Sequence, residues 1–206
     1  MTLEEAIAKI KPLDHNAMEI AQKRWDSIAK PLHSLGKLET LLIQIAGITG
    51  NAEVDLSRRG LIAMCADNGV VEEGVTQTGQ EVTAENFLKY DTSVGVMCKQ
   101  NHAEIFPVDM GMVTDTKVRT DHKIAYGTQN MTKGPAMTRE QAVKGLEAGI
   151  DMVRELNDKG YRILATGEMG IGNTTTSSAV ASVLLKKPVE EMTGRGAGLT
   201  SEGLVR

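Results

Sequence analysis

Aromatic residues, cysteines and positive charge are all scarce in this sequence. Its 206 residues include one Trp, three Tyr, two Phe and two Cys, and 23 Lys and Arg stand against 27 Asp and Glu, for a formal net charge of −4. Binding to nucleic-acid phosphates needs a positive footprint, and binding to single strands needs aromatic rings for base stacking. Nucleic acid is therefore not an expected partner.

Long hydrophobic runs are also missing. No stretch of the sequence approaches the roughly 18 uninterrupted apolar residues of a membrane span. Residues 1–12 alternate charged and apolar side chains, unlike the basic head and apolar core of a signal peptide. We therefore expect a cytoplasmic protein with no membrane partner.

The residues that bind metals or act as nucleophiles show no suitable spacing. Cys65 and Cys98 lie far apart in separate apolar runs, which is typical of reduced thiols in a core, and the four histidines are scattered along the chain. Zinc sites need closely spaced ligands, and a serine nucleophile of the hydrolase type needs a G-x-S-x-G turn. The sequence contains neither pattern, so we expect no metal site and no nucleophilic triad.

The first 50 residues are predicted to form helices. Thr2 and Glu5 fit a capping box, and the apolar residues within 38–46 recur at spacings of three and four, which places them on one helical face. Three helices fit before residue 50, and no strand-like run occurs there. Since the length suits one large domain with an appendage, residues 1–50 are predicted to form a helical arm or small subdomain.

From residue 51 onward, short apolar runs alternate with helix-like stretches. Predicted strands and helices follow one another in the order strand 61–66, helix 83–100, strand 103–108, helix 138–160 and strand 161–166. Such alternation is typical of βαβ units, so residues 51–206 are predicted to form an α/β core, a parallel sheet flanked by helices. Pro107 cannot donate a ladder hydrogen bond, which favours an edge position for the second strand.

The three predicted strands share one ending, an acidic residue followed by a spacer and a glycine. These endings are Asp67-Asn68-Gly69, Asp109-Met110-Gly111 and Glu168-Met169-Gly170. Because ligands of open parallel sheets bind beyond the carboxyl ends of the strands, we expect Asp67, Asp109 and Glu168 to line one pocket. The alternative is that each acid only caps the turn or helix that follows it.

A glycine-rich run, residues 167–176, leads from the third strand into a helix predicted to start at Thr174. Asn173 and Thr174 follow Gly172, so the run lacks both the Lys of a Walker A loop and the third Gly of a dinucleotide fingerprint. NTP hydrolysis and NAD-dependent redox chemistry are therefore disfavoured. The helix amides behind Gly170 and Gly172 suit a single phosphate or another anion, and an ordinary Asn or Thr cap is the alternative.

Methionine is frequent, with 11 residues in the chain. Three of them, Met64, Met110 and Met169, lie near the ends of predicted strands. A thioether packs against a flat ring as readily as against core side chains. Both a wall for a flat apolar ligand and ordinary core packing therefore stay open for these residues.

Taken in order, several segments resemble one known family over nearly the whole chain. The matching segments are 30–39, 66–70, 73–75, 82–83, 109–111, 127–131, 134–137 and 167–175. The chain is similar to the nicotinate-nucleotide–dimethylbenzimidazole phosphoribosyltransferases, which make the α-ribazole phosphate of the lower cobalamin loop.

The resemblance implies a Rossmann-like parallel sheet with a small helical domain, a homodimer, and no metal or organic cofactor. The implied reaction transfers phosphoribose from nicotinate mononucleotide to 5,6-dimethylbenzimidazole with inversion at the anomeric carbon, and yields α-ribazole 5′-phosphate and nicotinate in cobalamin biosynthesis. By motif, Thr78 and Asn86 fall where the family contacts the benzimidazole. Glu168, Met169 and Gly170 fall where the family holds substrate and phosphate.

Two departures from the family pattern bear on activity. Asn68 stands where the pattern commonly has His, which removes a titratable group. Family members are considerably longer, and the resemblance places their general base, as well as a phosphate-binding lysine, beyond Arg206. We therefore expect part of a phosphoribosyltransferase without a catalytic residue of its own, and the alternative is a non-catalytic module that binds nucleotide or benzimidazole.

Overall fold

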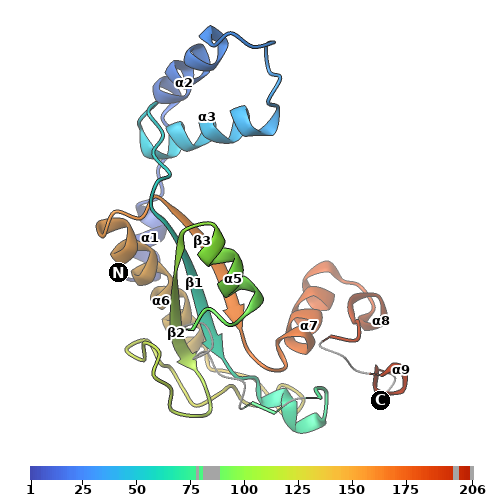
Figure 1. Ribbon diagram of the computed structural model, residues 1–206. Coiled ribbons are helices and arrows are strands. Elements are labelled where there is room, and N and C mark those ends of the chain that lie inside the picture. Colours follow the sequence, from blue (N-terminus) through green and yellow to red (C-terminus); the bar gives the residue numbers. More distant parts are fainter. Residues whose placement is uncertain (78, 81–88, 197–199, 205–206) are drawn as a thin grey trace. The chain divides into compact units, whose positions relative to one another are not determined.

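The computed structural model describes residues 1–77, 79–80, 89–196 and 200–204 (Figure 1). Its elements in chain order are α1 (Leu3–Ala8), α2 (His15–Ser27), α3 (Lys37–Thr49), β1 (Arg59–Ala66), η1 (Gly69–Glu73), α5 (Ser93–Gln100), β2 (Ala103–Gly111), α6 (Arg139–Asp158), β3 (Ile163–Met169), α7 (Asn173–Leu185), α8 (Val189–Met192) and α9 (Ser201–Leu204). The three strands form one parallel sheet in the order β2-β1-β3. The predicted α/β fold with a parallel sheet is confirmed.

The chain divides into two compact units, Thr2–Ser57 and Arg58–Arg206 with Met1. The first unit contains α1, α2 and α3, the three helices predicted before residue 50, and the second contains the sheet. We propose that residues 1–50 form a helical subdomain and that residues 51–206 form the transferase core. Among the described residues, no helix combines the length and the apolar character needed to cross a membrane.

In the first unit, α2 packs against α3. Asp14 caps α2 by accepting a first-turn amide, and Gly50, with a φ of 65°, ends α3. Lys30 and Glu39 form an ion pair of 2.9 Å, although their side chains are only 12% and 3% exposed. Glu39 also accepts the backbone amide of Leu35. The two contacts of Glu39 fix the turn that leads into α3.

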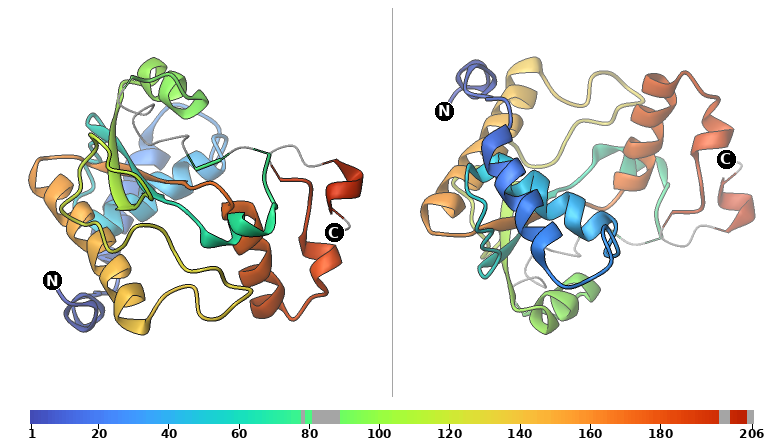
Figure 2. Two further views of the ribbon diagram at one scale, coloured as in Figure 1. Left: turned by 90° about the horizontal axis from the view of Figure 1, so that it is seen from below. Right: turned by 90° about the horizontal axis from the view of Figure 1, so that it is seen from above.

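The sheet in the second unit carries helices on both faces. On one face α5 contributes Cys98 to a core that includes Cys65, and on the other α6 contributes Met152 and Leu156 to a core that includes Ile62. The left view of Figure 2 shows the strands between α5 in green and α6 in light orange. Both cysteines are buried free thiols, as the sequence predicts.

Local sequence signals for helix starts and strand placement are confirmed. The capping boxes form at α1, between Thr2 and Glu5, and at α6, between Thr138 and Gln141. Pro107 lies within β2, which is an edge strand, as its missing amide predicts. These features depend on single residues or on residues three positions apart, so the local sequence is enough to predict them.

Two predicted elements differ from the structure. The third strand covers Ile163–Met169 instead of 161–166, because the Tyr161 amide donates to Leu156 and closes the end of α6 after Gly160, whose φ is 87°. Of the helix predicted over 83–100, the structure shows α5 from Ser93 onward, and residues 81–88 lie outside the described residues.

Gly170, in the turn after β3, packs against the end of β1. A Cβ at this position would lie 2.0 Å from the carbonyl oxygen of Ala66. Gly170→Ala is expected to lower the free energy of unfolding by about 1–3 kcal/mol, because backbone has to move to make room. Urea unfolding measures this change.

The matched control is Gly149→Ala in α6, where a Cβ would meet no described atom within 4 Å. Since Ala is the better helix former, the free energy of unfolding is expected to rise there by about 0.5–1 kcal/mol. Equal effects of the two substitutions would contradict the close packing of the turn.

Candidate functional site

The loops that follow the three strands meet at the carboxyl edge of the sheet. The backbone amide of Asp67 donates to the Gly111 carbonyl at 2.9 Å, and the Thr128 amide donates to the Asp67 carbonyl at 3.0 Å. The Asn68 amide donates to the Ile171 carbonyl at 3.3 Å. The two residues directly after β1 therefore connect the loops after β2 and β3.

Among the residues that the structure describes, Glu168 is the strand-end acid that borders a cavity. Asp67 and Asp109 are 0% exposed, whereas Glu168 is exposed and lines a hollow. Met64 of β1 pairs with Glu168, and the next residue, Cys65, pairs with Asp109. Successive side chains of a strand point to opposite faces, so Glu168 and Asp109 project from opposite faces of the sheet. The prediction that the three acids line one pocket is wrong for Asp67 and Asp109.

The two buried carboxylates hold the loop after β2. Asp67 Oδ2 accepts the Val113 amide at 2.9 Å, and Asp109 Oδ1 accepts the Met112 amide at 2.8 Å. Lys123 Nζ lies 3.1 Å from the other oxygen of Asp109. These contacts match the capping role that the sequence left open, and substrate binding by either residue stays a prediction.

Asp67 is the less well satisfied of the two carboxylates. Among the described residues its Oδ1 is buried without a hydrogen-bond partner. Burial and the neighbouring Asp109 carboxylate raise the pKa of Asp67, and the Val113 amide acts against this shift. The ionised form of Asp67 is therefore disfavoured in the folded protein.

Glu168 borders a mostly apolar cavity of about 290 Å³. Its walls include Met64 and Met110 from the strands, Met137 from the loop before α6, and Ala142 from α6. Two of the three strand-end methionines thus face a cavity. Met169, the third, packs against the core on the opposite face of the sheet.

A hydrogen bond connects this cavity to the start of α7. Asn173, the first residue of α7, donates from Nδ2 to Glu168 Oε2. Partial burial of the carboxylate raises the pKa of Glu168, and the Asn173 amide opposes this shift. The carboxylate is therefore fixed on one side and open to the cavity on the other.

The start of α7 borders a second cavity, of about 490 Å³. Gly172 is the N-cap, with a φ of 86°, and forms no side-chain cap. Thr174 and Arg195 contribute to the lining of this cavity. Backbone amides at a helix start, hydroxyls and a guanidinium form a suitable environment for an anion. Arg195 was not predicted, and its only sequence signal is a single Arg between two glycines.

Two predicted binding residues, Thr78 and Asn86, lie outside the described residues. Gly170, Gly172, Asn173 and Thr174, which the glycine-rich run predicts as anion-binding residues, lie together in the turn after β3 and the start of α7. In the part of the chain that the structure describes, no group of three or more His, Cys, Asp or Glu side chains is placed to hold a metal ion.

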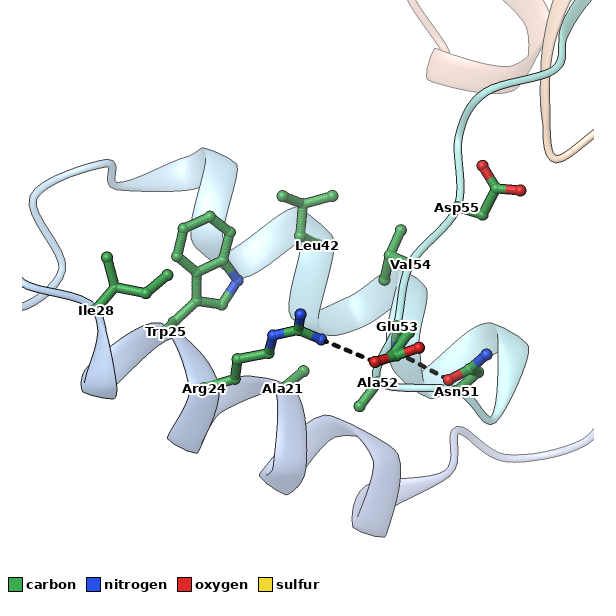
Figure 3. A pocket seen from close by; sticks show the side chains of 10 residues that line it. All are labelled: Ala21, Arg24, Trp25, Ile28, Leu42, Asn51, Ala52, Glu53, Val54 and Asp55. Carbon is green, nitrogen blue, oxygen red and sulfur yellow. Dashed lines mark hydrogen bonds and ion pairs between the residues drawn. The ribbon is translucent and has the colours of Figure 1, made fainter.

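A further hollow, of about 590 Å³, lies in the helical unit between α2, α3 and residues 51–55 (Figure 3). Trp25 and Leu42 form part of its apolar lining, and Arg24 and Glu53 approach each other to 3.6 Å. Arg24 and Glu53 thus pair with each other, Asp55 also lines the hollow, and none of the predicted site residues does. The candidate site is therefore the pair of cavities that Glu168 and Asn173 connect.

Removal of the Asp67 charge is expected to change how stability depends on pH. Because the folded pKa of Asp67 is raised, the unsubstituted protein loses stability as the pH rises from the unfolded value of about 4 through the folded value. Asp67→Asn, which keeps an oxygen for the Val113 amide, is expected to become more stable relative to the unsubstituted protein over this range.

Urea unfolding between about pH 4 and pH 8 measures the difference in free energy. Asp26→Asn, at an exposed position of α2, controls for the loss of one carboxylate. The raised pKa of Asp67 would be contradicted if the difference in free energy of unfolding between Asp67→Asn and the unsubstituted protein stayed constant with pH.

Comparison with known proteins assigns the chain to a family. A family model described as Phosphoribosyltransferase matches residues 10–206. The nicotinate-nucleotide–dimethylbenzimidazole phosphoribosyltransferase of Ruminiclostridium cellulolyticum is 50% identical over 210 residues, which cover 100% of this chain and 60% of that protein. The enzyme of the same name from Clostridium acetobutylicum is 49% identical over 207 residues, 98% of this chain and 59% of that protein. The chain thus spans about 60% of the length of these relatives.

Solved structures agree with the sequence comparison. The crystal structure of CobT from Thermus thermophilus matches with a TM-score of 0.82 and 36% identity, over 92% of this chain and 59% of that one. A second structure, of a nicotinate-nucleotide–dimethylbenzimidazole phosphoribosyltransferase from the same organism, matches with a TM-score of 0.81 and 34% identity, over 94% and 59%. The chain belongs to the phosphoribosyltransferase family of these nicotinate-nucleotide–dimethylbenzimidazole enzymes.

Proposed function

We propose that this chain supplies the substrate-binding site of a transferase that moves phosphoribose from nicotinate mononucleotide to 5,6-dimethylbenzimidazole. The hydrogen bond between Asn173 and Glu168 carries the proposal, because it joins an apolar cavity to the anion-compatible start of α7. The product, α-ribazole 5′-phosphate, has the same two parts, an uncharged planar base and a phosphate, with ribose between them. The names of the relatives support this reaction.

The apolar cavity suits an uncharged planar base. Met64, Met110 and Met137 offer thioethers to the faces of a ring, and Glu168 is the one charged residue in its described lining. The described lining supplies no cation for a nicotinate carboxylate, which would meet the Glu168 carboxylate there, whereas a benzimidazole N–H can donate to Glu168. We therefore assign this cavity to dimethylbenzimidazole. Contacts from Thr78 and Asn86 to the same base stay predictions.

The start of α7 suits the phosphate. Gly172 provides no side-chain cap, the amides of Asn173 and Thr175 donate to the carbonyls of Gly170 and Gly172, and Thr174 and Arg195 line the adjoining cavity. The helix dipole and the guanidinium both favour a dianion at this position. In this proposal Gly170 and Asn173 shape the turn around the phosphate, while the buried Asp67 and Asp109 hold the adjoining loops, and their substrate contacts stay predictions.

The proposed reaction exchanges one glycosidic bond for another. A ring nitrogen of the benzimidazole bonds to the anomeric carbon while the bond from that carbon to the nicotinate nitrogen breaks, and the electron pair of the broken bond stays on nicotinate. Positive charge develops on the ribose, and the Glu168 carboxylate stabilises it. The second benzimidazole nitrogen then releases its proton, and the general base that the resemblance places beyond Arg206 stays a prediction.

The whole protein is further proposed to be a cytoplasmic homodimer with a Rossmann-like core and without a metal or organic cofactor. These statements rest on the family resemblance and on composition. Gel filtration tests the dimer, and activity after treatment with a chelator tests the independence from metal.

Filling the apolar cavity is expected to block the base selectively. Ala142→Phe places a ring in the cavity that Ala142 lines, so dimethylbenzimidazole binding is expected to weaken at least about tenfold, or about 1.4 kcal/mol. Binding of inorganic phosphate is expected to stay the same, and calorimetric titration measures both. The control is Lys144→Phe, at an exposed position of α6 outside the lining. An equal loss for both ligands would refute the assignment of the cavity.

Incubation with both substrates tests the function itself. Nicotinate mononucleotide and dimethylbenzimidazole are expected to bind the 206-residue chain, with turnover slower by about 10²–10⁴-fold than in a family member that has the general base. Chromatography detects α-ribazole 5′-phosphate, and calorimetry gives the dissociation constants. In a complete enzyme, Glu168→Gln is expected to lower kcat/KM for nicotinate mononucleotide. If neither substrate binds, the proposed function is wrong; rapid turnover contradicts only the prediction about the general base.

A further inference from the structure

Asn68 joins the end of β1 to the turn after β3 through its side-chain amide. Nδ2 donates to the Ile171 carbonyl at 3.1 Å, and Oδ1 accepts the Thr176 hydroxyl at 3.3 Å. Ile171 lies within the turn, and Thr176 lies in the first turn of α7. One amide group therefore holds both the turn and the helix start against the central strand of the sheet.

The turn packs directly on this side chain. A Cβ on Gly170 would lie 3.1 Å from Asn68 Nδ2, and a Cβ on Gly172 would lie 3.2 Å from Asn68 Cβ. The contact is thus between the backbone of the turn and the side chain of Asn68. Removal of that side chain leaves a gap beneath the turn, so its position becomes less well defined.

Asn68 is itself held by its surroundings. The backbone carbonyl of Asn68 accepts hydrogen bonds from the side-chain amide of Gln80 at 3.2 Å and from the backbone amide of Val71, also at 3.2 Å. The amide of the next residue, Gly69, donates to the Thr128 hydroxyl at 3.1 Å. Since the residue is half-buried and anchored by these bonds, its side chain is a rigid support for the turn.

The Asn68 side chain offers a donor and an acceptor at the same time. Its Nδ2 donates to the Ile171 carbonyl, and its Oδ1 is one of two acceptors of the Thr176 hydroxyl, the other being the Asn173 carbonyl at 3.0 Å. A side-chain amide supplies both and does not titrate, whereas an ionised Asp has no donor and an Ala has neither group. The geometry of the turn is therefore independent of pH at this contact.

We propose that Asn68 is the positioning residue of the phosphate-binding turn. It acts through Ile171 and Thr176, and it keeps the α7 amides and Asn173, the partner of Glu168, in the arrangement that receives the phosphate. The inference rests on the proposed function, because that function assigns the start of α7 to the phosphate. Asn68 itself does not contact the substrate in this role.

Asn68→Ala tests the proposal with ligands that differ in the phosphate. Calorimetry compares nicotinate mononucleotide, nicotinate riboside, which has no phosphate, and dimethylbenzimidazole. Binding of the mononucleotide is expected to weaken about tenfold, or about 1.4 kcal/mol, and binding of the other two is expected to stay within about twofold. The control is Asn101→Ala, since Asn101 donates to the Met97 carbonyl at the end of α5 and lies outside the turn.

A second variant covers the case in which Asn68→Ala does not fold. Thr176→Val removes the hydroxyl that donates to Asn68 Oδ1 and to the Asn173 carbonyl, and it preserves the shape of the side chain. It is expected to weaken mononucleotide binding about threefold, with unchanged binding of dimethylbenzimidazole, because one of two hydrogen bonds to the amide is lost.

Amide hydrogen exchange without ligand gives a readout that does not depend on the function. Asn68→Ala is expected to speed exchange about tenfold at residues 173–176 and to leave α6 unchanged. Unchanged exchange there overturns the proposal, and so does an equal loss of affinity for all three ligands, since that indicates a general effect on folding. Failure of the unsubstituted chain to bind any ligand overturns the proposed function and the phosphate assignment together, which distinguishes it from failure of the Asn68 inference alone.

Discussion

The backbone of Asp67 and Asn68 connects the loops that follow the three strands, and the rest of the candidate site depends on this connection. β1 is the central strand, so the residues that leave its end lie between the loops after β2 and β3. Asp67 bonds to Gly111 and Thr128, and Asn68 bonds to Ile171. Because these are backbone bonds, they hold the loops together whatever side chains the loops carry. The cavities at this edge take their shape from them.

Two buried carboxylates reinforce this connection at a cost in stability. A buried charge is unfavourable unless it is paired, and Lys123 pairs with Asp109 while the second oxygen of Asp67 has no partner among the described residues. Asp109 accepts a hydrogen bond from the Met112 amide, and Asp67 accepts one from the Val113 amide. These bonds fix the direction in which the chain leaves β2. The acids therefore act on the fold, and through it on the site.

Most helices and strands of this fold can be predicted from short sequence patterns, because the hydrogen bonds that start and end them join residues close together in the chain. Thr2 and Thr138 start helices through bonds to residues three positions away, so no distant part of the chain is needed to predict them. The face to which a strand-end acid points is not local. It depends on the register, because Glu168 pairs with Met64 of β1 whereas Asp109 pairs with the next residue, Cys65. Similar acid-x-glycine endings therefore place Glu168 at a cavity and Asp109 in the core.

The same distinction explains which parts of the candidate site the sequence could predict. The anion-binding turn before α7 can be predicted from the glycine-rich run 167–176 alone. The hydrogen bond from Asn68 to the Ile171 carbonyl, in contrast, joins residues 103 positions apart in the chain. Neither segment alone reveals that bond, and Arg195 likewise approaches from outside the run. The consequence is functional, because the base cavity includes side chains of β1 and the turn is fixed by Asn68, directly after β1. Both halves of a bound nucleotide would thus be positioned relative to one strand, and such preorganisation lowers the entropy cost of binding a ligand that spans the two cavities.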